Sequence, residues 1–226
     1  ARFMERALLE PGLGYYATAE RRVGRSGDFM TAPELHPILG AAIAELAAAT
    51  WERLGRPSRF RWREYGAGEG TLVLAAINRL ARTAHPLLAA MEISISEANP
   101  HRVAELASAL AALPGGGPPV VAAGGPPVPG IVVANEFADA LPFHILVGRA
   151  DAPAGFLERR VTLDAVTNSL GWTEGAPDPA VAEHLATLTS GWPPLAEGQL
   201  AEVSPATAAW ARDRKSTRLN SSHRCI

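Results

Sequence analysis

The sequence predicts an α/β fold built on a doubly wound parallel sheet. Short apolar segments alternate with segments of helical periodicity, which is the pattern of consecutive βαβ units. A glycine-rich turn, Gly66-Ala67-Gly68-Glu69-Gly70, joins the first predicted strand to a helix. Residues 130–134 form a short β-branched run, which is typical of a strand covered on both faces.

Strands and helices can be placed along the chain from local signals. The predicted strands are residues 60–65, 91–96, 119–122 and 130–134, and residues 156–164 are predicted to form an exposed strand. Apolar residues at helical spacing predict helices over 38–54 and 71–84. Three more helices are expected where a capping side chain precedes a proline, at Asn99-Pro100, Asp178-Pro179 and Ser204-Pro205. Residues 114–130 are rich in Gly and Pro and are predicted to be mostly loop.

These elements predict a division into segments. Residues 1–58 form an N-terminal helical cap, 59–149 a cofactor-binding core, and 150–200 an insertion, because the alternation breaks there. Residues 201–214 begin a helix that returns to the core. Residues 215–226 are polar and Ser-rich, contain the only lysine and the only cysteine, and are expected to be an artefactual or disordered tail.

Composition excludes several classes of function. The 226 residues are 47% hydrophobic and 19% charged, so a core can be buried, and the net charge of −2 argues against a nucleic-acid-binding surface. No apolar run is long enough to span a bilayer, and the first residues show no signal-peptide pattern. One cysteine excludes a disulfide framework. We therefore expect no membrane insertion and a reducing, cytoplasmic setting.

The glycine turn predicts a binding site for a nucleoside cofactor. Closely spaced glycines let the backbone pass under a ligand, and the following helix offers free N–H groups there. Glu64 is the last acidic residue of the first predicted strand and is expected to point into the same crevice. Glu97 follows the second strand, where a carboxylate can accept hydrogen bonds from ribose hydroxyls. Two alternatives remain: a turn needed only for packing, and a Glu97 that only favours a helix N-terminus. The expected cofactor-binding residues of these segments are Glu64, Gly66, Gly68, Gly70, Thr71 and Glu97.

Two further polar segments are expected at the same edge of the sheet. Asn135, Glu136 and Asp139 follow the last predicted core strand, where chemistry is usually placed, although a polar helix cap would look alike. Gly27, Asp28 and Thr31 lie in a polar loop before the first long helix, and the simpler interpretation is a turn with a helix entry. No metal site is predicted, since the spacing of the histidines is not that of ligands; outside the predicted tail these are His36, His85, His101, His144 and His184.

Several motifs together resemble one family. The chain is similar to the MidA-like class I S-adenosylmethionine-dependent methyltransferases, which include the mitochondrial complex I assembly protein that dimethylates an arginine. The similarity covers about residues 3–212. The motifs that carry it occur in this order: GYY at 14–16, GDFMTAPE at 27–34, EYGAGEGT at 64–71, NEFADALP at 135–142, ERRV at 158–161 and AEVSPATAAW at 201–210.

The resemblance implies a Rossmann-like methyltransferase fold and S-adenosyl-L-methionine as cofactor. It also implies a protein substrate, of the respiratory complex I subunit type, and makes residues 150–200 a substrate subdomain. Glu69 stands where the family pattern has Arg, and Glu97-Ala98-Asn99-Pro100 where it has Glu-Val-Ser-Pro. The family continues after Trp210 with further strands, so an incomplete sheet is expected. The oligomeric state is not predicted.

The predicted function is methyl transfer to a protein arginine. Its guanidinium stays protonated, so transfer needs proton loss and carboxylates that orient the planar group. Glu136 and Asp139 are the expected carboxylates, sharing a face if their segment turns helically, and Asn135 is the expected hydrogen-bonding partner of cofactor or nucleophile. The alternatives are a methyltransferase with a small-molecule acceptor and a non-catalytic assembly factor that binds S-adenosylmethionine. A dehydrogenase fits less well, because the turn lacks the G-x-G-x-x-G spacing.

Overall fold

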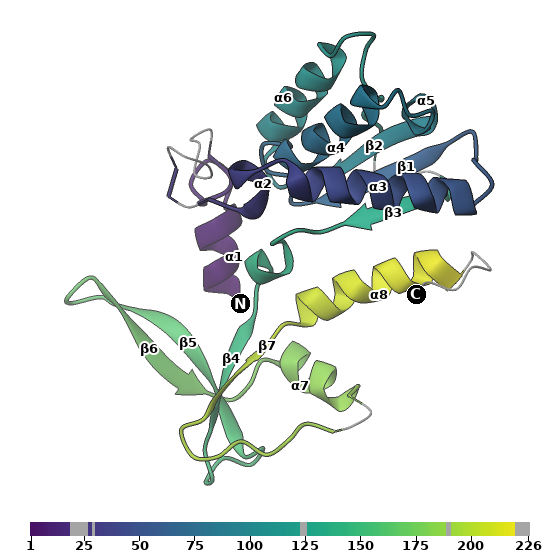
Figure 1. The fold of residues 1–226 in the computed structure, drawn as a ribbon. Coiled ribbons are helices and arrows are strands. Elements are labelled where there is room, and N and C mark those ends of the chain that lie inside the picture. The colour runs from purple at the N-terminus through teal and green to yellow at the C-terminus, as the bar shows by residue number, and fades with distance from the viewer. Residues whose placement is uncertain (19–26, 29, 123–125, 189–190, 220–226) are drawn as a thin grey trace. The chain divides into compact units, whose positions relative to one another are not determined.

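The computed structural model describes residues 1–18, 27–28, 30–122, 126–188 and 191–219, with side chains described as far as residue 212. The chain forms two compact units. The larger unit is Leu8–Phe137, and the smaller unit combines Ala1–Ala7 with Ala138–Ile226. Helix α1 (Arg2–Leu9) spans the point at which the division falls near the N-terminus (Figure 1).

A parallel sheet forms the centre of the larger unit. Its strands are β1 (Phe60–Tyr65), β2 (Met91–Ser96) and β3 (Gly130–Val133), in the order β2-β1-β3. Val120 adds an isolated parallel bridge to Ile93 on β2, so the predicted strand at 119–122 is reduced to one bridged residue. The order therefore reverses at β1, as the prediction of a doubly wound sheet requires.

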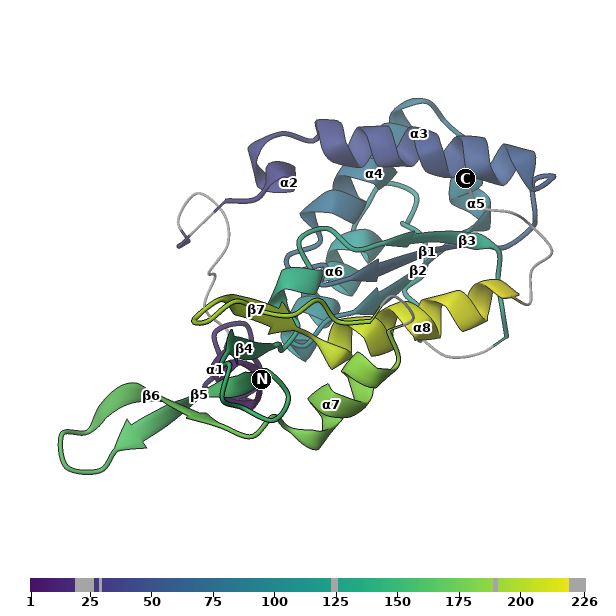
Figure 2. The same cartoon turned by 90° about the horizontal axis from the view of Figure 1, so that it is seen from below.

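Helices cover one face of this sheet and form the main core. They are α3 (Ile38–Arg53), α4 (Thr71–Arg82), α5 (Leu87–Ala90) and α6 (Pro100–Ala111) (Figure 2). Helix α2 (Ala32–Leu35) packs against α3 and α4. Fully buried Phe60 and Trp62 of β1 pack in the same cluster as residues of α3, α4 and α6. Gly40 lets α3 approach α4 closely, because a Cβ there would lie 2.6 Å from the Cβ of Ala75.

The opposite face of β1 and β2 is charged rather than apolar. Arg61 donates from Nε to Glu92 at 2.7 Å, and Arg59 donates from Nη2 to the same carboxylate at 2.9 Å. On β3, Val132 is 52% exposed, so the prediction of a strand covered on both faces is wrong at this residue. The run of β-branched residues indicated a strand correctly but not which faces are buried, because burial depends on neighbouring elements.

The smaller unit contains an antiparallel sheet that the sequence only partly predicted. Its order is β6-β5-β4-β7, made of β4 (His144–Gly148), β5 (Phe156–Asp164), β6 (Ser169–Gly175) and β7 (Leu200–Val203). Leu146, Val181 and Val203 form its core. The 3-10 helix η1 (Ala138–Ala140), α7 (Pro179–Ala186) and α8 (Pro205–Leu219) complete the unit. Of the strands, only β5 was predicted.

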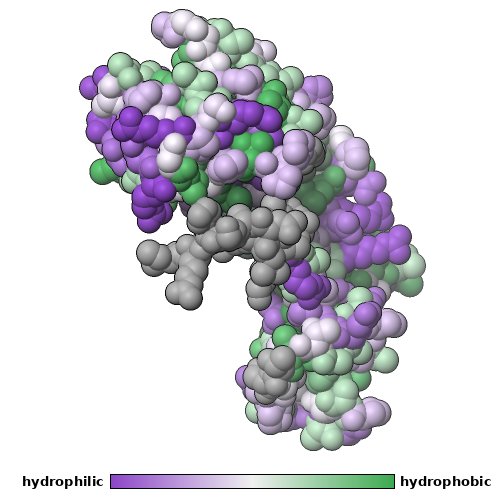
Figure 3. Space-filling view, turned by 90° about the vertical axis from the view of Figure 1, so that its right-hand side faces the viewer, coloured by the Kyte–Doolittle hydropathy of each residue, from purple (hydrophilic) through white to green (hydrophobic). Residues whose placement is uncertain are grey.

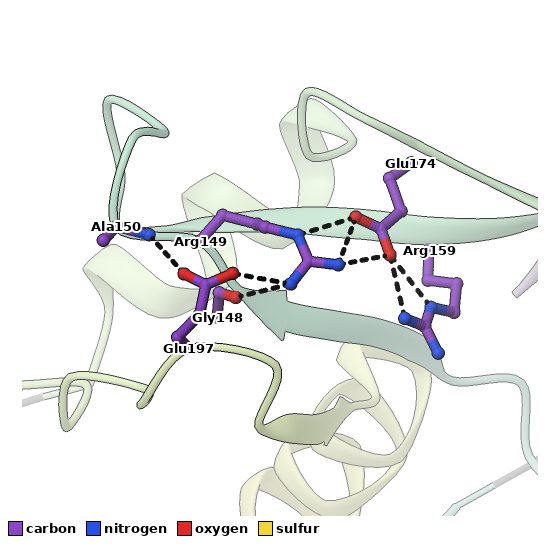
Figure 4. A network of polar contacts seen from close by, with 6 residues as sticks. All are labelled: Gly148, Arg149, Ala150, Arg159, Glu174 and Glu197. Carbon is purple, nitrogen blue, oxygen red and sulfur yellow. Dashed lines mark hydrogen bonds and ion pairs between the residues drawn. The ribbon is translucent and has the colours of Figure 1, made fainter.

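Ion pairs join the strands of this sheet (Figure 4). Glu174 on β6 accepts hydrogen bonds from Arg149 at 2.9 and 3.0 Å and from Arg159 at 2.8 Å. Glu197 accepts a bond from Arg149 at 2.9 Å and one from the amide of Ala150 at 3.0 Å. The planar guanidinium of Arg149 donates hydrogen bonds to two carboxylates at once, and a lysine could not make these bonds in the same geometry.

The predicted helix starts are confirmed. Asn99 and Asp178 accept hydrogen bonds from the amides of His101 and Ala180. Ser204 accepts one from the amide of Thr207 at 3.1 Å. Helix α8 continues to Leu219 and thus into the predicted tail, of which residues 220–226 lie outside the described residues.

The described surface is of mixed polarity. Figure 3 shows hydrophilic and hydrophobic residues interspersed over the drawn face of the molecule. Among the described residues, no helix is both long and apolar enough to cross a membrane.

Candidate functional site

The carboxyl ends of the three parallel strands bring the predicted segments to one edge of the larger unit. The glycine turn follows β1, Glu97 follows β2, and Asn135 follows β3. The strand order reverses between β1 and β3, and ligands of open α/β sheets bind at such a switch point. Gly66 donates its backbone N–H to the carbonyl of Ser96 at 2.9 Å, which fixes the turn to the end of β2.

The three glycines of the turn differ in what surrounds them. All have left-handed backbone angles, with φ of 63° at Gly66, 54° at Gly68 and 76° at Gly70. A Cβ at Gly70 would lie 2.5 Å from Cδ1 of Leu106, and one at Gly66 would lie 3.0 Å from Cδ2 of Phe137. A Cβ at Gly68 would meet no atom within 4 Å. Packing therefore explains Gly66 and Gly70, whereas the open space over Gly68 suits the approach of a ligand.

Glu97 ties the glycine turn to the start of α6. Its Oε2 accepts a hydrogen bond from the amide of Gly68 at 3.0 Å, and its Oε1 accepts one from the amide of Asn99 at 3.1 Å. Glu97 thus lies at a helix N-terminus and also beside the glycine turn, and its binding of ribose hydroxyls stays a prediction. Each carboxylate oxygen retains acceptor capacity for further donors such as hydroxyls.

Glu64 is buried at the end of β1. It is 3% exposed, and the indole N–H of Trp62 donates to its Oε2 at 2.8 Å. Burial raises the pKa of Glu64 to about 7, against the lowering effect of the Trp62 hydrogen bond, and the charge of Glu97 raises it further. The carboxyl thus changes its charge near neutral pH. Thr71, the other predicted residue here, is half-buried at the first position of α4.

The polar loop before α3 is held by local hydrogen bonds. Asp28 accepts a bond from the hydroxyl of Tyr15 at 2.7 Å. Thr31 caps α2 in a reciprocal pair with Glu34, so its contacts are those of the helix entry that was the simpler interpretation. Gly27 lies in a bend, and Phe29 of the same motif lies outside the described residues.

The segment after β3 is not helical at Glu136. This residue has a φ of 47°, and the helical turn η1 begins only at Ala138. Glu136 and Asp139 were expected to share a face if their segment were helical. That condition is not met, because the backbone of Glu136 is in the left-handed region. Both carboxylates are exposed, and the described residues provide neither with a hydrogen bond or ion pair. Phe137 instead packs on Tyr65, with ring centroids 5.5 Å apart.

The sequence did not predict a cluster of charged residues around Glu158. In the smaller unit, Nδ1 of His144 lies 2.7 Å from Oε1 of Glu158, whose Oε2 accepts bonds from Arg160 at 2.9 Å and from the amide of Asp178 at 2.7 Å. These donors lower the pKa of Glu158, although burial opposes them. His144 lies on β4 and Glu158 on the neighbouring strand β5, so no signal within either segment could predict the pair. No group of three or more potential metal ligands occurs in the described part of the chain.

The fold and this strand-end site are those of an α/β protein that binds a nucleoside cofactor. A family of S-adenosyl-L-methionine-dependent methyltransferases matches residues 42–225, and the chain belongs to this family. The predicted family, the α/β methyltransferase fold and the predicted cofactor, S-adenosyl-L-methionine, are thereby confirmed. The open space over Gly68 and the carboxylate of Glu97 fit such a cofactor.

Solved and curated relatives are similar over part of their length. A Burkholderia thailandensis protein bound to S-adenosyl-homocysteine has a TM-score of 0.73 and 28% identity, covering 96% of this chain and 54% of that one. The protein arginine methyltransferase NDUFAF7 homolog of Drosophila melanogaster is 32% identical over 165 residues, which is 65% of this chain and 38% of the relative. Human NDUFAF7 is 36% identical over 73 residues, or 32% of this chain and 16% of the relative. The chain therefore spans about half or less of these proteins.

Proposed function

We propose that this chain transfers a methyl group from S-adenosyl-L-methionine to a side-chain nitrogen of a protein arginine. The observation that carries the proposal is the exposed carboxylate of Glu136, which follows β3 directly after Asn135. Asp139, which is also exposed, is proposed as the second carboxylate from its place three residues further along the chain. Carboxylates suit a guanidinium because they accept its planar N–H groups in pairs. The similarity to proteins named as arginine methyltransferases supports the same acceptor. We propose a subunit of respiratory complex I as the substrate, as the family resemblance implies.

Each group has a distinct part in the proposed reaction. S-Adenosyl-L-methionine supplies a methyl group on a positively charged sulfur. The larger unit binds the adenosyl part through the glycine turn and Glu97. Glu136 and Asp139 accept the guanidinium N–H groups and orient the attacking nitrogen, and positioning of this kind lowers barriers by several kcal/mol. The proton that this nitrogen loses as it gains the methyl group passes to one of these carboxylates and from there to water. Asn135, half-buried beside Glu136, offers an amide to cofactor or nucleophile.

Charge-removing variants test the acceptor role. We expect Glu136→Gln and Asp139→Asn to keep the affinity for S-adenosyl-homocysteine within about twofold while methyl transfer to the acceptor falls at least about a hundredfold. Transfer of labelled methyl groups to a complex I subunit, and to its arginine-to-lysine variant, measures the activity. Glu183→Gln is the matched control, because Glu183 is an exposed carboxylate on α7.

The competing functions give different results. A methyltransferase with a small-molecule acceptor would not distinguish the protein from its arginine-to-lysine variant. A non-catalytic binding protein would bind S-adenosyl-homocysteine without transferring methyl groups. A parallel loss of cofactor affinity in both carboxylate variants would show that these residues serve the cofactor or the fold instead.

A further inference from the structure

Asn99 makes more contacts than a helix cap requires. Its side chain is buried, with the residue 1% exposed, and its Oδ1 accepts a hydrogen bond from the amide of His101 at 3.1 Å. Its Nδ2 donates to the carbonyl of Thr18 at 2.8 Å and to that of Tyr16 at 3.3 Å. A side-chain amide has two donor hydrogens and an oxygen with two lone pairs, so Asn99 uses both of its donors and one acceptor position. Capping occupies only the oxygen.

The two amide donors hold a segment that is distant in sequence. Residues 15–18 lie more than eighty positions before Asn99, with separations of 83 and 81 residues for the two bonds. Within the segment, Tyr15 packs edge-on against Tyr16 with ring centroids 5.0 Å apart. The hydroxyl of Tyr15 donates a hydrogen bond to Asp28. The segment thus connects Asp28, a predicted cofactor-binding residue, to the start of α6.

The same short turn also holds Glu97. The amide of Asn99 donates to Oε1 of Glu97, whose other oxygen accepts the amide of Gly68. The backbone of Asn99 therefore fixes the carboxylate predicted to bind ribose, while its side chain fixes the 15–18 segment. Asp28 and Glu97 come from different parts of the chain, and Asn99 links them.

We propose that Asn99 is a positioning residue for the cofactor site, which it assembles by holding residues 15–18 against the Glu97 turn. The proposal deepens the proposed function and rests on it. Loss of both amide-to-carbonyl hydrogen bonds should weaken cofactor binding by about tenfold.

Substitutions can separate this role from capping. Asn99→Asp and Asn99→Ser both keep an oxygen that caps α6, but neither offers the two amide donors. We expect Asn99→Ser to melt within a few degrees of the parent chain, and Asn99→Asp to melt at a lower temperature, because its buried carboxylate would face the carbonyls of Tyr16 and Thr18. By calorimetry, S-adenosyl-homocysteine should bind about tenfold more weakly, and the amides of residues 15–18 should exchange hydrogen faster. Asp178→Ser is the control, since Asp178 caps α7 before a proline in the same way, and it should leave this affinity unchanged.

Kinetics add a readout that a purely structural role would not give. The KM for S-adenosyl-L-methionine should rise while kcat at saturation stays near the parent value. Unchanged affinity in both variants, or unchanged exchange at residues 15–18, would overturn the proposal. If the parent chain binds S-adenosyl-homocysteine but transfers no methyl group, the proposed function fails while the positioning role of Asn99 is still decided by affinity and exchange.

Discussion

Glu64 should make the stability of the larger unit depend on pH. It is a carboxyl group that is 3% exposed, and burial raises its pKa from 4.5 to about 7. The folded chain then holds a proton that the unfolded chain releases at lower pH, so stability is lost as pH rises from about 4.5 to about 7. Glu64→Gln keeps the size of the side chain and an oxygen for the indole of Trp62, but it removes the ionisation.

The size of the effect follows from the pKa. Raising it from 4.5 to about 7 corresponds to about 3 kcal/mol, at about 1.4 kcal/mol per pKa unit. We therefore expect Glu64→Gln to match the parent chain near pH 4.5 and to exceed its stability by up to about 3 kcal/mol above pH 8. For a chain of this size, that is a melting temperature higher by about 6–12 °C.

Thermal melts followed by circular dichroism between pH 4.5 and pH 8.5 measure the effect. Glu183→Gln removes an exposed carboxylate and serves as the control, which should run parallel to the parent chain. If the Glu64→Gln and parent curves are also parallel over this range, Glu64 does not carry the buried proton and the reasoning from its burial is refuted.

Further substitutions test other parts of the structure. Gly70→Ala should destabilise the chain by about 1–3 kcal/mol in urea unfolding, because its Cβ would lie 2.5 Å from Leu106 and its φ is 76°; an unaltered midpoint would contradict this packing role. Glu97→Ala should weaken S-adenosyl-homocysteine binding by about 1–3 kcal/mol in calorimetry, and equal affinity would remove it from the site. Glu158→Gln should lower stability at pH 7 by about 1–3 kcal/mol by weakening the bonds from His144 and Arg160. The lowered pKa of Glu158 makes its contribution present above its unfolded pKa and lost as pH falls, so the variant and parent melts should converge in acid.

Local signals explain what the sequence could predict. The caps at Asn99, Asp178 and Ser204 combine a polar side chain with a following proline, and both act within one turn. Strands β4, β6 and β7 were missed for the opposite reason. Strand β7 has four residues, and β6 contains Gly171 and Gly175, so each is specified by pairing with distant strands rather than by its own pattern.

The sequence likewise predicted those features of the candidate site that depend on local signals and not those that depend on distant elements. The sequence predicted the glycine turn and the carboxylate after β2, because both lie at fixed offsets from a strand. It could not show that Gly70 is needed for packing against Leu106 while Gly68 is open, since that difference depends on α6. Nor could the sequence show the second role of Asn99, whose side-chain amide donates a hydrogen bond to the carbonyl of Thr18, 81 residues earlier in the chain.

Electrostatics connects the acidic strand-end site to the choice of acceptor. The methyl donor carries a positive sulfur and an arginine acceptor carries a positive guanidinium, so the proposed reaction brings two cations together. Their repulsion at 4 Å is about 1 kcal/mol in water and about 4 kcal/mol at the effective dielectric of a protein surface. In the proposed reaction, Glu97 after β2 and exposed Glu136 after β3 would supply negative charge that offsets this repulsion. The sulfur of the used cofactor is uncharged, so these carboxylates would attract it less and its release would be favoured. A neutral acceptor would need no such compensation, and for this reason the exposed carboxylate at Glu136 favours a cationic substrate.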